Sequence, residues 1–141
     1  MKNTLIEALQ WRYATKKYDP SFQLDPNDQE TLEHVLQLTP SSYGLQPLHY
    51  IWLEDKALLE KTKNLAWNQQ QIVDAAGVLV LCTKTELEAA YLDAHADLMR
   101  DTRNMQEEQI KGFRAHLHTA IGNKPADQVQ VWNDKQAYIA L

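Results

Sequence analysis

The first part of the chain has the hydrophobic spacing of an amphipathic helix. Polar residues separate the members of one apolar stripe, which are Leu5, Ile6, Leu9 and Tyr13. Tyr18-Asp19-Pro20 interrupts this pattern, because proline disfavours a helical conformation in the residue before it. The pattern therefore predicts one helix, followed by a loop.

A second amphipathic helix is predicted between two prolines. Asp25 can cap its N-terminus while Pro26 takes the first helical position, and Thr39-Pro40 ends it. Leu32 and Val35 belong to its apolar face. Both of the first two helices should therefore have one face available for packing.

Two further stretches have the pattern of β-strands. Residues 48–53 alternate and are rich in aromatic and β-branched side chains, and residues 78–82 form a short apolar run. A helix over residues 56–66 is predicted between them, and helical spacing returns in three segments after Thr85. Two strands and about six helices predict a mostly helical α+β fold, in which two strands are few for a sheet.

The last predicted helix begins at Pro125 and lacks a C-terminal signal. It runs into Tyr138-Ile139-Ala140-Leu141, where a glycine, a cation or a polar tail would normally stand. We therefore expect residues 1–141 to be a single domain that is truncated at its C-terminus, with an incomplete sheet.

Composition and charge narrow the possible partners. The chain is 44% hydrophobic and 23% charged, with a formal net charge of −5. This balance argues against a nucleic-acid-binding protein, since no basic stripe is left for phosphates. The longest apolar run, residues 75–82, is too short to span a membrane, and we expect a cytoplasmic protein with no membrane partner.

Metal and disulfide chemistry find little support. Cys82 is the only cysteine, which excludes a disulfide within the chain. His116 and His118 are two residues apart and point to different faces of a helix, while His34 has no second ligand at metal spacing. We therefore expect no metal site.

Three polar segments are candidates for binding chemistry. The cations of Arg12-Tyr13-Ala14-Thr15-Lys16-Lys17 either seat an anion or complement a helix dipole. The serine-containing turn over residues 40–47 either holds a phosphate or the edge of a ring, or is an ordinary capped turn. The amides of residues 68–71 either pair with a flat heterocycle or form a solvated polar turn.

In their order and spacing, these segments resemble the N-terminal portion of the nitroreductase family. This family comprises FMN-dependent NAD(P)H oxidoreductases, including oxygen-insensitive nitroreductases and dihydropteridine reductases. The resemblance rests on residues 12–19, on Pro40-Ser41-Ser42 with Gln46-Pro47, and on the amides before the second strand, and it extends from residue 8 to residue 141. It implies an α/β/α sandwich built as an intertwined homodimer, with FMN at the subunit interface.

The resemblance also assigns roles around the first helix. Arg12 would grip the FMN phosphate, while Tyr13 and Ala14 would line that site in place of the family's frequent His and Ser. Lys16 would reach the isoalloxazine ring near N1 and the C2 carbonyl, where a cation stabilises the reduced flavin.

Further contacts are implied along the rest of the chain. Ser41 and Tyr43 would add contacts in the second loop, and Asn68 would hydrogen-bond the pyrimidine edge of the flavin. Gln71 stands where relatives often carry lysine, so a positive charge is absent there. Phe113 would match an aromatic residue that the partner subunit places over the flavin face, where substrates stack.

The resemblance implies ping-pong hydride transfer from NADH or NADPH through FMN to nitroaromatics, quinones or related acceptors. No catalytic side chain is needed, because the flavin N5 carries the hydride. Arg100 and Arg103 could touch a nicotinamide phosphate, with surface helix charges as the alternative. Because the family's later strands and remaining phosphate contacts are missing, we expect weak or absent FMN binding. The alternative function is a non-catalytic homologue that dimerises or serves as a scaffold.

Overall fold

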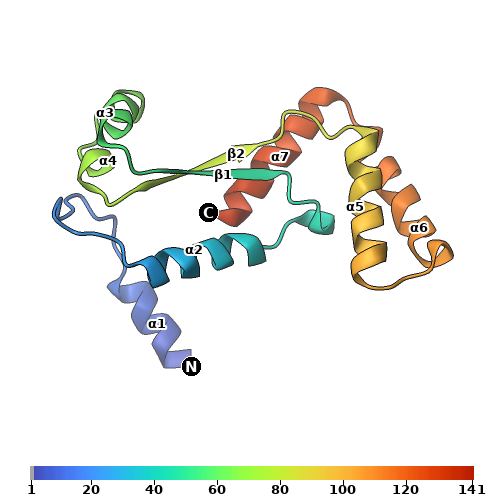
Figure 1. The fold of residues 1–141 in the computed structure, drawn as a ribbon, viewed down its shortest axis with the longest axis horizontal. Helices are drawn as coiled ribbons and strands as arrows, with labels where there is room; N and C mark the ends of the chain where they lie inside the picture. Colours follow the sequence, from blue (N-terminus) through green and yellow to red (C-terminus); the bar gives the residue numbers. More distant parts are fainter. Residues whose placement is uncertain (1) are drawn as a thin grey trace. The chain divides into compact units, whose positions relative to one another are not determined.

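The computed structural model describes residues 2–141, and helices dominate them (Figure 1). Two strands, β1 and β2, form a two-stranded sheet, which confirms the predicted α+β class. The elements in chain order are α1 (Lys2–Trp11), α2 (Pro26–Leu38), β1 (Leu48–Leu53), α3 (Lys56–Leu65), α4 (Gln71–Asp74), β2 (Val78–Thr83), α5 (Ala89–Thr102), α6 (Glu107–Leu117) and α7 (Ala126–Ala140).

Most of these bounds agree with the hydrophobic pattern, and the differences have local causes. Tyr13 lies beyond α1, because the helix ends at Trp11. The four-residue helix α4 was not predicted, since so short a segment shows no helical period. α6 begins only at Glu107, where the side-chain oxygen of Gln109 accepts the backbone N–H of Gln106 at 2.7 Å.

The two strands pair in an antiparallel sense. The backbone N–H of Lys84, just after β2, donates to the carbonyl of Pro47, just before β1, at 2.9 Å. The end of one strand therefore lies beside the beginning of the other. Where β2 begins, Gly77 lies against the indole of Trp52: a Cβ at this glycine would come within 2.4 Å of the ring. A side chain at position 77 would displace Trp52.

The described chain divides into two compact units. The first unit comprises the residues up to Asp25 together with Trp52–Val78, and the second comprises Pro26–Ile51 and Leu79–Leu141. The assignment of the whole chain to a single domain stays a prediction.

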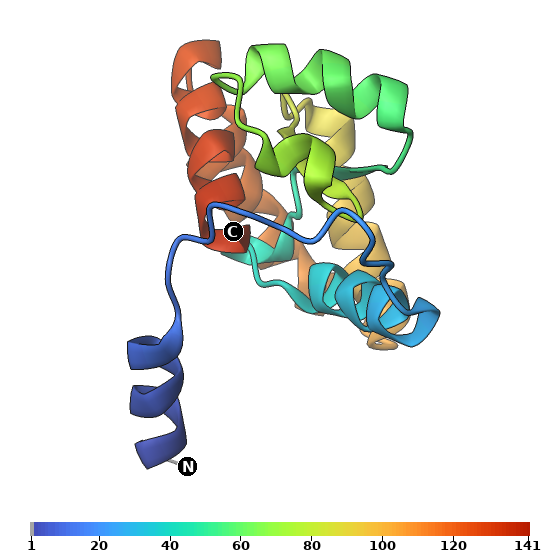
Figure 2. The ribbon, with the colours of Figure 1, turned by 90° about the vertical axis from the view of Figure 1, so that its left-hand side faces the viewer.

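In the first unit, α3 and α4 lie side by side (Figure 2). α3 begins at Asp55, whose carboxylate accepts the backbone N–H of Leu58 at 2.8 Å. Leu59 of this helix is fully buried. The ammonium of Lys56 donates to the carbonyls of Val73 and Ala75 at 2.9 and 3.0 Å, which ties the start of α3 to the end of α4.

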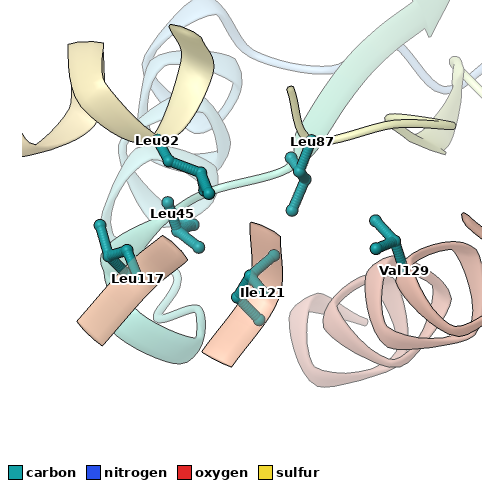
Figure 3. Close-up of a cluster of buried hydrophobic side chains, with 6 residues drawn as sticks. All are labelled: Leu45, Leu87, Leu92, Leu117, Ile121 and Val129. Atoms are coloured by element: carbon teal, nitrogen blue, oxygen red, sulfur yellow. The ribbon is translucent and has the colours of Figure 1, made fainter. Parts of the chain in front are cut away.

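The second unit contains a hydrophobic core, shown in Figure 3. Its members come from the segments flanking the sheet, from α5, from α7, and from the end of α6 with the π-helical turn after it: Leu45, Leu87, Leu92, Leu117, Ile121 and Val129. Burying a side chain of this size contributes about 1.5–3 kcal/mol. The same core therefore anchors α5, α6 and α7 and the turn that carries Leu45.

The apolar faces of the first two helices remain exposed. On α1, Leu5 is 64% exposed and Trp11 is 82% exposed, and α2 contains no buried residue. Val35, for example, keeps 56% of its surface in solvent. Burial of these predicted faces therefore does not hold either unit together.

Candidate functional site

The cationic stretch of residues 12–17 directly follows α1 in the first unit. The last hydrogen bond of the helix runs from the Arg12 N–H to the Ala8 carbonyl at 3.0 Å, and the backbone beyond it is irregular. Arg12 and Lys16 are both exposed, as are Tyr13 and Ala14 between them. The predicted change from helix to loop therefore presents these side chains to solvent.

The amide cluster of residues 68–71 lies in the same unit, between α3 and α4. Trp67 and Asn68 both adopt positive φ angles, 53° and 56°, so the backbone reverses sharply there. The N–H of Asn68 donates to the carbonyl of Lys63 at 3.0 Å. The ammonium of Lys63 also donates to the Gln70 side chain at 2.7 Å. These bonds hold Asn68 at the end of α3.

Gln71 connects the amide cluster to the cationic stretch. Its Nε2 approaches the carbonyl oxygen of Thr15 at 3.5 Å, which is long for a hydrogen bond. Thr15 lies between Ala14 and Lys16, so the predicted residues of the two segments come together here within one unit. Oε1 of Gln71 takes no part in this contact with Thr15.

The cations of residues 12–17 have no ion-pair partner in the described part of the chain. Among residues 2–141, no carboxylate pairs with Arg12, Lys16 or Lys17. The nearest carboxylate in sequence, Asp19, accepts instead from the N–H and the hydroxyl of Ser21 at 2.9 and 2.6 Å. These hydrogen bonds, the hydroxyl first, hold the pKa of Asp19 below its ordinary value of 3.8. A negative ligand would therefore meet three cations that carry no internal counterion.

Ser41 and Tyr43 belong to the second unit, in the turn of residues 41–46. The Ser41 hydroxyl oxygen accepts the Gln46 N–H at 2.7 Å. Tyr43 has a φ of 60° and its side chain is 38% exposed. Its carbonyl lies 3.1 Å from Nε2 of His95 on α5. The turn thus carries a hydroxyl and an aromatic ring two positions apart in sequence.

Phe113, on α6, also lies near His95. Its ring lies 6.2 Å from that of His95, and the ring of Tyr43 packs edge-on against His116 at 5.5 Å between centroids. Both distances fall within the range of favourable ring pairs. Two of the three site residues predicted in this unit, Tyr43 and Phe113, therefore share His95 as a neighbour.

The predicted site residues are thus divided between the two units. The first unit holds Arg12, Tyr13, Ala14, Lys16, Asn68 and Gln71, and the second holds Ser41, Tyr43 and Phe113. His95 was missed by sequence reasoning, because a single histidine on a helix gives no signal. Gln136 was missed too, although its place seven positions after the apolar Val129 puts it on the same face of the last helix, which was a usable clue.

The cations of α5 and α6 contrast with those of residues 12–17. Arg100 donates to Asp97, Asp101 and Glu107 at 2.8–2.9 Å. Arg114 bonds Asp97 at 2.9 Å and Glu107 at 3.2 Å. The Arg114 hydrogen bond holds the pKa of Asp97 below its ordinary value, and that of Arg100 does the same for the pKa of Glu107. These contacts favour a structural role for Arg100 over a ligand role.

The described residues offer neither a metal site nor a membrane-spanning helix. No group of three or more His, Cys, Asp or Glu side chains within them is arranged to hold a metal ion. Nor is any helix in that part of the chain long and apolar enough to cross a membrane. Cys82 is half-buried in β2 and free.

The chain is similar to proteins of known sequence over its whole length. It is 32% identical over 148 aligned residues to a candidate NAD(P)H nitroreductase of Staphylococcus epidermidis, covering all of this chain and 66% of that protein. A relative in Staphylococcus aureus is 29% identical and is covered to 65%. The chain thus spans just under two thirds of the length of these curated relatives.

Solved structures share its fold. A candidate nitroreductase of Bacillus subtilis superposes with a TM-score of 0.83 at 15% identity, over 99% of this chain and 67% of that chain. A further candidate nitroreductase, from Exiguobacterium sibiricum, was solved in complex with FMN and superposes at 0.74 with 13% identity, over 96% of this chain and 64% of that chain. At such identities the likeness establishes the fold alone. Residues 9–141, which make up nearly all of the chain, match the model of the Nitroreductase family, and the protein therefore belongs to the nitroreductase family.

Proposed function

We propose that this protein is an FMN-dependent oxidoreductase that uses NADH or NADPH to reduce small acceptors such as nitroaromatics or quinones. The observation that carries the proposal is the approach of Gln71 to Thr15, because it joins the cationic stretch and the amide cluster in one unit. Two likenesses support it: the Staphylococcus epidermidis relative is named as an NAD(P)H nitroreductase, and the Exiguobacterium sibiricum structure contains FMN.

The donors of the first unit fit the phosphate end of FMN. Arg12 offers a planar fork of N–H groups that suits bidentate binding of phosphate, and it spends none of them on a carboxylate of the described chain. Asp19, which lies two positions after Lys17, accepts hydrogen bonds from Ser21. A phosphate would therefore gain the attraction of these cations without competition from an acidic neighbour.

The remaining predicted residues fit the ring end. Lys16 would place a positive charge near N1 and C2 of the ring, and Asn68 and Gln71 would offer donors and acceptors to its pyrimidine edge. FMN itself supplies the redox chemistry when bound, by accepting a hydride from NAD(P)H and passing it to the acceptor. Tyr13 and Ala14 would line the phosphate site without contributing charge.

We further propose that the site is completed in a homodimer, with Ser41, Tyr43 and Phe113 supplied across the subunit interface. The exposed apolar stripe of α1 supports association with another copy, since such contiguous apolar surface is uncommon on a monomer. The same stripe favours a second candidate function, in which the chain dimerises as a scaffold without turnover.

One experiment separates the two candidates. The purified 141-residue chain is tested for yellow colour and flavin absorbance, before and after addition of FMN, and its mass in solution is measured by analytical ultracentrifugation. The enzyme proposal expects flavin absorbance that bleaches with NADH or NADPH. A dimer that stays colourless with excess FMN would overturn it for this chain and support the scaffold.

Lys16 gives a sharper test of the ring contact. Lys16→Ala should slow bleaching about tenfold, equivalent to about 1.4 kcal/mol of activation free energy, because the cation that stabilises the reduced ring is lost. Lys17→Ala is the matched control and should bleach at the unaltered rate. Equal bleaching rates in all three proteins would refute the role given to Lys16.

A further inference from the structure

The turn of residues 41–46 carries unusual backbone strain. Three of its residues have positive φ angles: Tyr43 at 60°, Gly44 at 69° and Gln46 at 44°. Only glycine adopts this region freely, so Tyr43 and Gln46 are held there against their own preference. Non-glycine residues stay in such conformations only where their surroundings enforce them, and they cluster at functional sites.

Three long side chains from helices hold this turn in place. Oε1 of Gln136, on α7, accepts the backbone N–H of Ser42 at 2.8 Å. On α5, Nε2 of His95 lies 3.1 Å from the Tyr43 carbonyl, and the hydroxyl of Tyr91 donates to the Leu45 carbonyl at 2.6 Å. These bonds hold the peptide before Ser42, the peptide after the strained Tyr43, and the peptide after Leu45.

Gln136 is the most informative of the three. Only 2% of its surface is exposed, on a helix face whose preceding members Val129 and Asn133 are also buried. A polar side chain in such a place is costly unless it is hydrogen-bonded. Its amide nitrogen lies 3.4 Å from the Trp132 carbonyl of its own helix, a weak contact, while its oxygen makes the shorter bond to Ser42. An apolar residue would fill this position, and the bond to the turn is what the glutamine adds.

We propose that Gln136 is a positioning residue for cofactor binding: by holding the N–H of Ser42, it fixes the turn so that the Ser41 hydroxyl and the Tyr43 ring are presented in one geometry. The inference rests on the proposed function, because the ligand presented to is FMN. Gln136 itself touches no reacting atom. Its effect should pass through the turn, leaving the helix that carries it intact.

The test compares two buried amides of the same helix. Gln136→Met removes the acceptor oxygen and keeps an unbranched side chain of similar length. Asn133→Leu is the matched control, because Asn133 is fully buried but bonds the Lys84 carbonyl at 2.6 Å instead of the turn. Gln136→Glu restores an acceptor oxygen. FMN affinity and the visible circular dichroism of bound flavin are measured for each variant of the 141-residue chain, with amide hydrogen exchange of residues 42–46 in the flavin-free state.

We expect Gln136→Met to weaken FMN binding at least tenfold and to change the flavin dichroism, while Gln136→Glu binds within threefold of the unaltered chain and Asn133→Leu within twofold. Binding of Gln136→Met within twofold would overturn the proposal, and so would equal losses in Gln136→Met and Asn133→Leu. If Gln136→Met does not fold, Gln136→Asn, which withdraws the oxygen from Ser42, takes its place under the same criteria.

Amide exchange keeps this proposal separate from the proposed function. If the unaltered chain binds no FMN, the proposed function fails, but the holding of the turn is still measurable. Exchange at the Ser42 amide that rises at least tenfold in Gln136→Met and not in Asn133→Leu supports the positioning role. Exchange that is unchanged in Gln136→Met overturns it.

Discussion

Two groups of cations in this protein are handled in opposite ways. Arg100 and Arg114 sit within the α5–α6 hairpin, and each contacts at least two carboxylates. Arg12 and Lys16 follow α1 without any carboxylate partner in the described part of the chain. The arginines of the first group are thus paired with carboxylates of the same two helices, while the cations of the second group are exposed to solvent.

The difference separates structural charge from charge kept for a ligand. Ion pairs in a network stabilise the elements that they join, although each exposed pair contributes at most about 1 kcal/mol. Like charges gathered without counterions repel one another and add nothing to the stability of the unit. A group of the second kind is therefore better explained by an anion that it binds.

The largest expected effect is on the affinity for that anion. Arg12→Ala should weaken FMN binding by about 10- to 100-fold, since a hydrogen bond to a charged group contributes about 1.5–3 kcal/mol. The melting temperature should stay unchanged, because Arg12 has no ion pair within residues 2–141 to lose. Titration of flavin fluorescence measures the affinity. Lys17→Ala, with the same change in net charge, is the control. An equal loss of FMN affinity in that variant would show that Arg12 acts only through general electrostatic attraction.

A change in the other group should have the opposite signature. Arg114→Met keeps the apolar stem but removes the contacts to Asp97 and Glu107, and we expect the melting temperature to fall by about 4 °C. Lys111→Met, on the same helix, should lower the melting temperature by less than 1 °C, because within the described residues Lys111 pairs only with the exposed Glu108, at 3.6 Å. Differential scanning fluorimetry compares the two. A fall of equal size in both variants would show that the hairpin network has no special weight.

A smaller effect should appear in acid. The folded-state pKa values of Asp97 and Glu107 are lowered from their ordinary values of 3.8 and 4.5. Their stabilising contribution is therefore complete above about pH 5 and is lost as the pH falls through the lowered values. The unaltered chain should lose stability over this interval more steeply than Arg114→Met. Parallel pH profiles of urea unfolding for the two proteins would contradict the sign of this linkage.

Sequence reasoning predicted the regular elements well where one local cause dominates. β1 was placed at its observed residues by alternation, and α2 begins at Pro26 because that proline can only start a helix. α4 was missed because a single turn has no period, and Tyr13 was assigned to α1 because an apolar stripe does not mark where a helix ends.

The candidate site divides in the same way. The cationic stretch and the amide cluster could be identified from residue types alone, yet the approach of Gln71 to Thr15 joins residues far apart in sequence and could not be derived from either segment. The left-handed φ of Tyr43 was equally hidden, since tyrosine has no preference for that region. It depends on Gln136 and His95, whose contacts exist only in the folded chain.

The reversal at Trp67 and Asn68 has a practical consequence. Trp67 is 89% exposed and directly precedes the amide proposed for the pyrimidine edge of FMN. An indole in that place emits in a spectral region where flavins absorb. A flavin bound beside Asn68 would therefore quench the fluorescence of Trp67 by energy transfer. The chain therefore carries its own optical reporter at the ring end of the proposed site, readable without any label.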